Sequence, residues 1–480
     1  MRHFDIVVVG GGVNGAGIAR DLSGRGHSVL LLEKADLAQA TSSASSKLVH
    51  GGLRYLEHHE YRLVREALGE REVLLRTAPH IIWPLRFVLP HRPEMRPRWL
   101  LRAGLFLYDH LARRVSLPGA EAFRTAQDPR GAPLKPEFTH AFAYSDAWVE
   151  DSRLVLLCAM DAAARGAEIR PRCAFQAAER HPDHWRVTLE DGEVVQCRAL
   201  VNAAGPWVQK ALDAAHALPP GKVRLIRGSH IVLPRLYEGA HAYILQNDDR
   251  RVVFAIPYEG RFTLVGTTDV PHEGDPAEAR CTPEEAAYLC AAVSRQFRRQ
   301  VAPDDIAWTY SGVRPLFDDG AEDPSAVTRD YVLKLDEAGA PLLSVYGGKI
   351  TTFRRLAEEA AARVGAAIGR AGTPWTARAT LPGGDLGGRT HEQFAKEMAR
   401  ALPLVPPEWL PRLVRTHGSL LPEVMAGEPG AHLGATLSER ELDWMRAREW
   451  AATAEDVLWR RTKLGLHMTE AERAAVAARF

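Results

Sequence analysis

The hydrophobic pattern at the start of the chain predicts a strand, a helix and a second strand. Residues Phe4 to Val9 are almost continuously apolar and β-branched, which is typical of a strand buried in a parallel sheet. A glycine-rich turn follows, and a helical pattern begins near Val13 and ends near Gly24 to Gly26. Ser28 to Leu32 then predicts a second buried strand, which ends at Glu33. This order is that of a βαβ unit in an α/β protein.

The middle of the chain does not continue this alternation of strands and helices. Short apolar runs between turn residues predict a mostly antiparallel sheet in a second domain, interleaved with the first. These runs are Val187 to Leu189, Val194 to Cys197, Ser229 to Leu233, Val252 to Ile256 and Phe262 to Gly266. Within 1–375 we expect the first domain at about 1–80, 145–225 and 310–375, and the second at about 81–144 and 226–309.

Beyond residue 375 the pattern changes to chain breakers and helix starts. Glycines and a proline over 382–388 predict a linker. Three capping-box patterns then predict helix N-termini. They are Thr390 with Gln393, Ser438 with Glu441, and Thr469 with Glu472. We therefore expect a C-terminal helical domain over 376–480, and a mixture of α/β and α+β organisation for the whole chain.

Composition narrows the class of protein without choosing a function. The 480 residues carry a formal net charge of +1, so no overall field favours nucleic acid as a partner. The five cysteines are scattered and form no CxxC pair, so we expect neither a disulfide framework nor a bound metal. No apolar run approaches the ~20 residues of a membrane-spanning helix. The N-terminus lacks a signal-peptide pattern, and we expect a cytoplasmic protein.

The turn after the first strand matches a dinucleotide-binding fingerprint. Gly10, Gly12 and Gly15 fall in the pattern GxGxxG, with Asn14 inside it. Gly10 permits the tight turn, Gly12 lets the backbone approach a pyrophosphate, and Gly15 lets the helix pack close to the sheet. The helix N-terminus offers free N–H groups to phosphates. Glu33 can accept hydrogen bonds from ribose hydroxyls and would repel a 2′-phosphate, which disfavours NADP. A βαβ unit without a ligand is the alternative.

The fingerprint occurs once, which indicates one dinucleotide but does not choose between FAD and NAD. Two later segments, Ala199 to Gly205 and Leu342 to Thr352, predict strands that run into glycine turns. The second turn, Gly347-Gly348, precedes a helix whose N-terminus could stabilise negative charge on a reduced isoalloxazine ring. This favours flavin, with Gly205, Gly347, Gly348 and Thr351 as contacts. Two ordinary strand-to-helix turns would give the same pattern.

One segment, 86–114, is both basic and apolar. It holds seven arginines against Glu94 and Asp109, and it includes the run from Trp99 to Tyr108. Aromatic and aliphatic groups beside arginines suit a helix that lies in a membrane interface near anionic lipids. A buried helix with a solvated basic edge, or a contact in a homodimer, would give the same pattern.

Several segments, in order along the chain, resemble one family. They are Ala40–Glu57, Ala78–His91, Glu150–Arg153, Arg227–Val232, Gly266–Asp269, Trp308–Leu316, Thr328–Tyr331 and Gly347–Lys349. Through them the chain resembles the aerobic, FAD-dependent glycerol-3-phosphate dehydrogenases from residue 3 to about 470. The resemblance implies a glutathione-reductase-type FAD-binding Rossmann domain, interleaved with a mostly antiparallel substrate domain and followed by a C-terminal helical cap.

The resemblance also implies an activity. sn-Glycerol 3-phosphate would be oxidised to dihydroxyacetone phosphate, and the electrons would pass through FAD to a membrane quinone. The family lies on the cytoplasmic face of the cell membrane, which favours peripheral attachment to anionic lipid through 86–114. No flavin-attachment residue of the family is matched, so we expect non-covalent FAD. An oxidase that uses O₂, another flavoenzyme such as an amino-acid oxidase, and a non-catalytic flavoprotein are the alternatives.

The matching segments supply candidates for binding a phosphate dianion. Arginine suits bidentate contacts to phosphate, so we choose Arg54, Arg314 and Arg329, together with Lys349. Tyr55 would add a hydroxyl donor.

Oxidation at C2 also needs a base for the hydroxyl proton. His230 is the first candidate and His50 the second, since histidine titrates near working pH. Arg314 would stabilise the developing alkoxide, and Asp269 would hold one of these groups in place. A hydroxyl-rich loop, for which a serine-rich linker is the alternative, would wrap pyrophosphate and flavin. Its candidate contacts are Thr41, Ser42, Ser45, Ser46 and Lys47.

Overall fold

The predicted βαβ unit forms the centre of an eight-stranded sheet in the computed structural model, which describes residues 1–480 except 113, 220, 250 and 319–329. β1 (Arg2–Val9) lies between β2 (Val29–Glu33) and β10 (Val194–Asn202), both parallel to it. The parallel array continues with β7 (Glu168–Pro171) and β18 (Leu342–Tyr346). Antiparallel strands complete the sheet: β8 (Phe175–Arg180), β9 (Trp185–Leu189) and β17 (Val332–Asp336).

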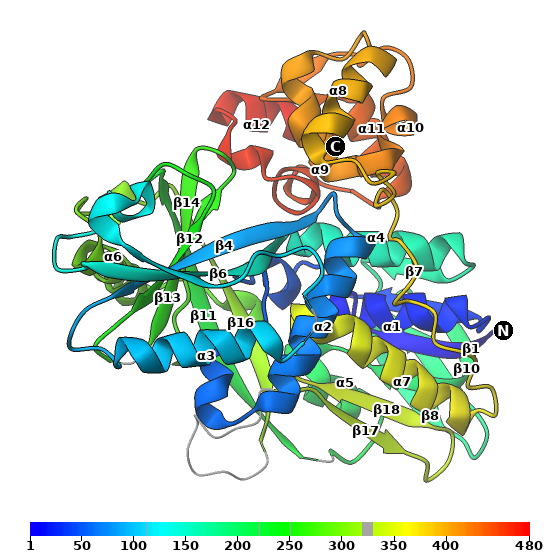
Figure 1. Ribbon diagram of the computed structural model, residues 1–480. Coiled ribbons are helices and arrows are strands. Elements are labelled where there is room, and N and C mark those ends of the chain that lie inside the picture. The colour runs from blue at the N-terminus through cyan, green and yellow to red at the C-terminus, as the bar shows by residue number, and fades with distance from the viewer. Residues whose placement is uncertain (113, 220, 250, 319–329) are drawn as a thin grey trace.

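Three long helices cover one face of this first sheet (Figure 1). They are α1 (Val13–Gly24), α4 (Asp151–Ala164) and α7 (Phe353–Ala367). Their apolar residues share one buried cluster with alternate residues of β1 and β2, such as Ile6 and Leu31. The other residues of the same strands, such as Val7 and Leu30, pack against α5 (Val208–Ala214) and the strands β8 and β9. Burial on both faces explains the continuous apolar runs of the sequence.

Two of the short runs from which the sequence predicts the antiparallel second sheet belong instead to this first sheet. Val187 to Leu189 is part of β9, and Val194 to Cys197 is the start of the central strand β10. Their assignment to the antiparallel sheet was wrong, although both lie within 145–225, the span expected for the first domain. An apolar pattern identifies a strand but not the sheet that it joins.

The second sheet has ten strands and is mostly antiparallel. β11 (Lys222–Pro234) pairs with β14, β15 and β16, and among the described pairs only β12 with β4 is parallel. The other strands are β3 (Leu48–Val49), β4 (Ile82–His91), β5 (Glu121–Arg124), β6 (His140–Val149), β12 (Ala242–Gln246), β13 (Val252–Tyr258), β14 (Phe262–Gly266), β15 (Val270–Pro271) and β16 (Trp308–Asp318). Helix α6 (Pro283–Gln296) packs on one face. Helices α2 (Tyr61–Thr77) and α3 (Arg98–His110) pack on the other.

The last hundred residues form the group of helices at the top of Figure 1, with its own small apolar clusters. It contains α8 (His391–Ala401), α9 (Leu410–His417), α10 (Leu421–Val424), α11 (Glu439–Arg448), α12 (Glu470–Ala477) and the hairpin β19 (His432–Gly434) and β20 (Leu437–Ser438). Thr390 and Thr469 form the predicted capping boxes. Ser438 accepts a hydrogen bond from the Glu441 N–H, but the Glu441 carboxylate binds Arg412 instead of closing the box. The predicted mixed fold with a C-terminal helical part is confirmed.

Candidate functional site

A cavity of about 2230 Å³ lies between the two sheets. Its wall begins at the glycine turn after β1, continues along loop 41–46 and ends beneath α3. Small-molecule sites typically measure ~300–1,000 Å³. The cavity therefore has room for a dinucleotide and a further substrate.

The glycine turn leaves no space for side chains. Gly10 has a φ of +109°, and a Cβ atom there would lie 2.4 Å from the Ala203 carbonyl oxygen. A Cβ atom at Gly15 would lie 1.8 Å from the Gly10 carbonyl oxygen. At Gly12 it would lie 3.1 Å from Ser42 Oγ. The N-cap residue Gly12 gives α1 no side-chain cap, and although Ser42 Oγ accepts from the Val13 N–H, the positive end of the helix still suits a phosphate.

The Glu33 carboxylate secures this turn. Its Oε2 accepts a hydrogen bond from the Gly11 N–H at 2.7 Å, and Oε1 accepts one from the Ala35 N–H at 2.9 Å. Burial raises the pKa of Glu33, and these two donors oppose that shift. Each oxygen keeps a second lone pair, so the carboxylate can still accept from a ribose hydroxyl as the sequence predicts.

Residues that sequence reasoning missed lie at the same end of the cavity. Lys34 directly follows Glu33, and its Nζ lies 3.4 Å from the centroid of the Trp207 ring. Both residues line the cavity, together with Lys210. The sequence could have indicated them, because Lys34 directly follows Glu33 and Trp207 lies two residues after Gly205.

The second glycine turn meets the first. Asn14 Nδ2 donates to the Gly347 carbonyl at 3.1 Å, and a Cβ atom at Gly348 would lie 3.1 Å from the same nitrogen. Asn14 Oδ1 is buried and has no hydrogen-bond partner among the described residues. Gly347 and Gly348, like Gly205, have positive φ and line the cavity. Bare glycine backbone and an unsatisfied buried oxygen fit a polar cofactor such as FAD.

Almost every hydroxyl of loop 41–47 forms a hydrogen bond, which excludes the alternative of a flexible linker. Ser42 Oγ accepts from the Val13 N–H at 2.9 Å, and Thr41 Oγ1 donates to the Val313 carbonyl at 2.6 Å. Further along, Ser45 Oγ donates to Asp151 and Ser46 Oγ is hydrogen bonded to His230.

Two predicted cofactor residues lie behind the wall of the cavity. Lys47 is not among the lining residues, and its buried ammonium donates to Asp151 Oδ2 at 2.8 Å. Gly15 is also absent from the lining and acts through the close approach of α1 to the turn at Gly10. We therefore assign both to support of the site instead of direct contact.

The two candidate bases line the cavity from different elements. His230, on β11, is 3% exposed, and its Nε2 lies 2.9 Å from Ser46 Oγ. Burial, followed by the charges of Lys47 and Arg314, lowers the pKa of His230 well below its ordinary value. His50 follows β3, and its N–H donates to Thr351 Oγ1 at 3.1 Å. Burial also lowers the pKa of His50, so both imidazoles are neutral and able to accept a proton.

Cationic groups line the same part of the cavity. Lys349 Nζ lies 3.9 Å from the centroid of the Tyr55 ring, and Arg54 lies on the same turn of chain as Tyr55. Arg314 extends from β16, and its Nη1 lies 3.7 Å from Asp269 Oδ1. The sequence did not show which candidate group Asp269 would hold, and in the structure its carboxylate lies beside Arg314.

Arg329, a further predicted phosphate ligand, lies outside the described residues. No group of three or more His, Cys, Asp or Glu side chains in the described part of the chain is placed to hold a metal ion.

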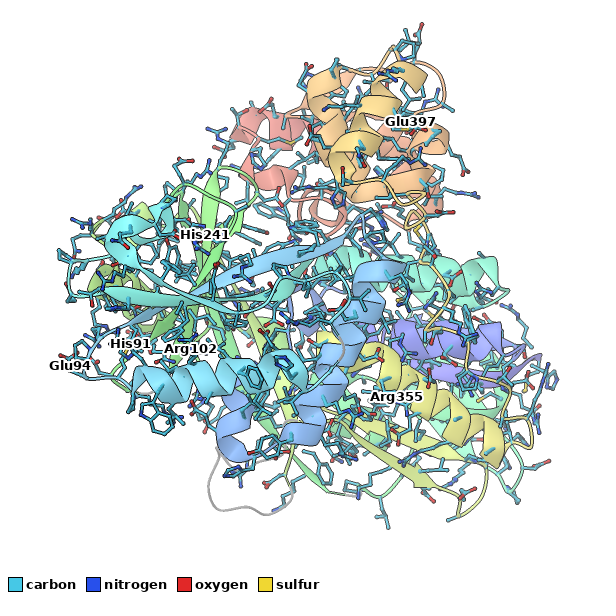
Figure 2. All side chains as sticks on the ribbon, viewed as in Figure 1. His91, Glu94, Arg102, His241, Arg355 and Glu397 are labelled. Atoms are coloured by element: carbon cyan, nitrogen blue, oxygen red, sulfur yellow. The ribbon has the colours of Figure 1, made fainter. Side chains whose placement is uncertain are left out.

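Segment 86–114 is a strand end, a loop and a helix, and distant carboxylates pair with part of its charge. Arg86 pairs with Glu121 at 2.9 Å, Arg92 with Asp248 at 2.9 Å and Arg96 with Glu57 at 2.8 Å. Figure 2 shows Arg102 on α3 and Glu94 in the loop before it. Among the described residues, Arg98 and Arg102 have no ion-pair partner. Residue 113 lies outside the description.

Comparisons with known proteins agree with this geometry. Residues 5–354 match the family described as FAD dependent oxidoreductase, and residues 374–479 match the C-terminal domain of alpha-glycerophosphate oxidase. The chain therefore belongs to the FAD-dependent oxidoreductases. Its relatives at about half identity include glycerol-3-phosphate dehydrogenases and a D-erythritol 1-phosphate dehydrogenase.

The chain is 51% identical to a glycerol-3-phosphate dehydrogenase of Pseudomonas aeruginosa, over 98% of this chain and 93% of that protein. It is 50% identical to a D-erythritol 1-phosphate dehydrogenase of Brucella abortus, over 99% and 97%. Among solved structures, the FAD complex of a Bacillus halodurans glycerol-3-phosphate dehydrogenase matches with a TM-score of 0.78 and 25% identity, over 99% of this chain and 93% of that one.

Proposed function

We propose that the protein oxidises sn-glycerol 3-phosphate to dihydroxyacetone phosphate. The main support is that cationic side chains and neutral histidines line the same cavity as the two glycine turns, at Gly10–Gly15 and Gly347–Gly348, which together form a cradle for the cofactor. The cradle suits the pyrophosphate of FAD, and the cations suit the phosphate of a small polyol. The identity of about half of all residues with glycerol-3-phosphate dehydrogenases of other bacteria supports this choice.

The reaction removes a hydride from C2 and a proton from the C2 hydroxyl. Bound FAD supplies the two-electron acceptor for the hydride. Arg54, Lys349 and Tyr55 bind the phosphate dianion and so orient C2. His230 accepts the hydroxyl proton, with His50 as the second candidate. Arg314 stabilises negative charge that develops on the C2 oxygen, and the product ketone forms as the C–H bond breaks.

The far end of the cavity supports a quinone as the final electron acceptor. Leu89, Leu100, Leu107 and Phe254 line the cavity there, beneath and along α3. Apolar side chains with charged neighbours such as Arg92 and Arg96 suit the ring, carbonyl oxygens and tail of a quinone, whereas O₂ needs no such space. Two electrons and two protons would convert the quinone to its quinol and restore oxidised FAD.

The outer face of α3 supports attachment to a membrane surface. Trp99 is 71% exposed and Phe106 65%, next to Arg98 and Arg102, which form no ion pair within the described part of the chain. Such a face suits the interface of an anionic bilayer. No helix in the described part of the chain has the length and hydropathy to cross a bilayer. The exposed face of α3 supports our proposal that the protein is peripheral on the cytoplasmic face of the cell membrane.

The test is anaerobic addition of substrate to the purified protein loaded with FAD. Flavin absorbance should bleach with sn-glycerol 3-phosphate but not with glycerol. D-Erythritol 1-phosphate is the second candidate substrate, favoured by the Brucella abortus relative and by the size of the cavity. Bleaching by the tetritol phosphate alone would move the assignment to that substrate. A protein that cannot be loaded with FAD would refute the proposal.

A further inference from the structure

The segment Glu150–Arg153 at the N-terminus of α4 has entered the site so far only through Asp151, the partner of Ser45 and Lys47. Figure 1 shows α4 directly below the C-terminal helices. Arg153 Nη1 donates to Glu449 Oε2 at 2.7 Å, and Ser152 Oγ donates to the Arg460 carbonyl at 2.8 Å. These two residues therefore hold the C-terminal part of the chain. The preceding residue, Asp151, contacts the cofactor loop instead.

Asp151 binds the cofactor loop from behind the cavity wall. Its carboxylate is fully buried, and Oδ2 accepts hydrogen bonds from Ser45 Oγ at 2.7 Å and from Lys47 Nζ at 2.8 Å. Lys47 Nζ also donates to Asp151 Oδ1 at 2.9 Å. The backbone of Lys47 has a φ of +58°, which residues with side chains rarely adopt. A buried, charge-assisted contact at both oxygens fixes this conformation of the loop.

The loop in turn fixes His230 on two sides. Ser46, between the two residues that Asp151 binds, is hydrogen bonded to His230 Nε2 at 2.9 Å. The Tyr310 hydroxyl donates to the Ser45 carbonyl at 2.7 Å, and its ring stacks on the imidazole with centroids 4.7 Å apart. One edge and one face of the imidazole are thus held by groups whose places depend on the Asp151 contacts.

We propose that Asp151 is a positioning residue for the reaction, which acts through Ser45, Lys47 and Tyr310 to fix the His230 imidazole. The proposal rests on the proposed function, since it concerns the same base. Displacing a reacting group by ~1 Å can slow a reaction about 100-fold. A defect of position therefore lowers the rate of the chemical step, whereas binding of substrate through Arg54 and Lys349 is unaffected.

The test uses FAD-loaded enzyme and the matched variants Asp151→Asn and Asp161→Asn. Asp161 is also on α4, is 7% exposed and pairs with Arg20 at 2.6 Å, but it does not contact the cofactor loop. Anaerobic stopped-flow absorbance measures flavin reduction by sn-glycerol 3-phosphate. In Asp151→Asn the limiting rate should fall about 10- to 100-fold, with half-saturation within about twofold of the unmodified enzyme. Asp161→Asn should keep the unmodified rate.

Tyr310→Phe decides the question if Asp151→Asn cannot hold FAD. This variant keeps the stacked ring but removes the donor to the Ser45 carbonyl, so its limiting rate should fall while flavin content stays constant. Unmodified rates in the FAD-loaded variants would overturn the positioning role. An unmodified enzyme that neither polyol phosphate reduces would overturn the proposed function and this inference with it.

Discussion

Replacement of Gly15 by alanine should weaken FAD binding without unfolding the protein. The added Cβ atom would lie 1.8 Å from the Gly10 carbonyl oxygen. An ordinary contact between carbon and oxygen is about 3.3 Å, so α1 and the turn must separate by about 1.5 Å. Overpacking of this kind costs about 1–3 kcal/mol. If the strain is relieved in the cofactor-free state, the Kd for FAD rises about 5- to 150-fold.

The assay is titration of the cofactor-free protein with FAD, followed by quenching of flavin fluorescence. Gly69→Ala is the matched control, because Gly69 lies within α2 and a Cβ atom there would meet nothing within 4 Å. Alanine in such a helix position is expected to be neutral or mildly stabilising. An unchanged Kd for Gly15→Ala would refute the argument that close packing of α1 against the turn shapes the phosphate site.

Three further predictions follow from charges and exposed groups. The limiting rate of flavin reduction at saturating substrate should stay constant from about pH 7 to well below 6.5, because burial and nearby cations lower the pKa of His230 and keep it neutral; a pH profile of that rate measures this. Burial opposes ionisation of Glu441, but Arg412 outweighs it and lowers the pKa to about 2. This carboxylate stabilises the fold fully above about pH 4.5, and the effect is lost as the pH falls toward about 2. Glu441→Gln should therefore lower the free energy of unfolding by roughly 3 kcal/mol at pH 7 and by less in acid, as measured by thermal unfolding. The double variant of Trp99→Ser and Phe106→Ser should lose binding to anionic vesicles but keep the rate of flavin reduction; equal vesicle binding would contradict the role of α3.

Much of the cofactor cradle could be predicted from sequence because its chemistry is local. The spacing of Gly10, Gly12 and Gly15 and the position of Glu33 at the end of the next strand are set within 33 residues, and the structure places them as expected. What could not be predicted depends on partners far along the chain. Asp269 could not be assigned to Arg314, because the two meet only when strands of the second sheet pair.

Which charges of segment 86–114 are neutralised could not be predicted from sequence for the same reason. Its arginines look like a field that faces lipid, but Arg86 and Arg92 end in ion pairs with Glu121 and Asp248. Sequence spacing gives the sign of a side chain but not which carboxylate will neutralise it. Lys47 is a second case, because its pairing with Asp151 removes it from the cavity wall.

The hydrogen bond from Asn14 to the Gly347 carbonyl has a consequence for the order of biosynthesis. The two turns that form the cradle are separated by 333 residues, and β1 pairs with β10, whose own neighbour is β18. Domains generally begin to fold while the ribosome still adds residues. Here the first turn leaves the ribosome early, but the second turn, at Gly347 and Gly348, can pack against it only after residue 351 has left the exit tunnel. We therefore expect flavin to bind late on the nascent chain, and a messenger truncated before that point should yield a polypeptide without the cofactor.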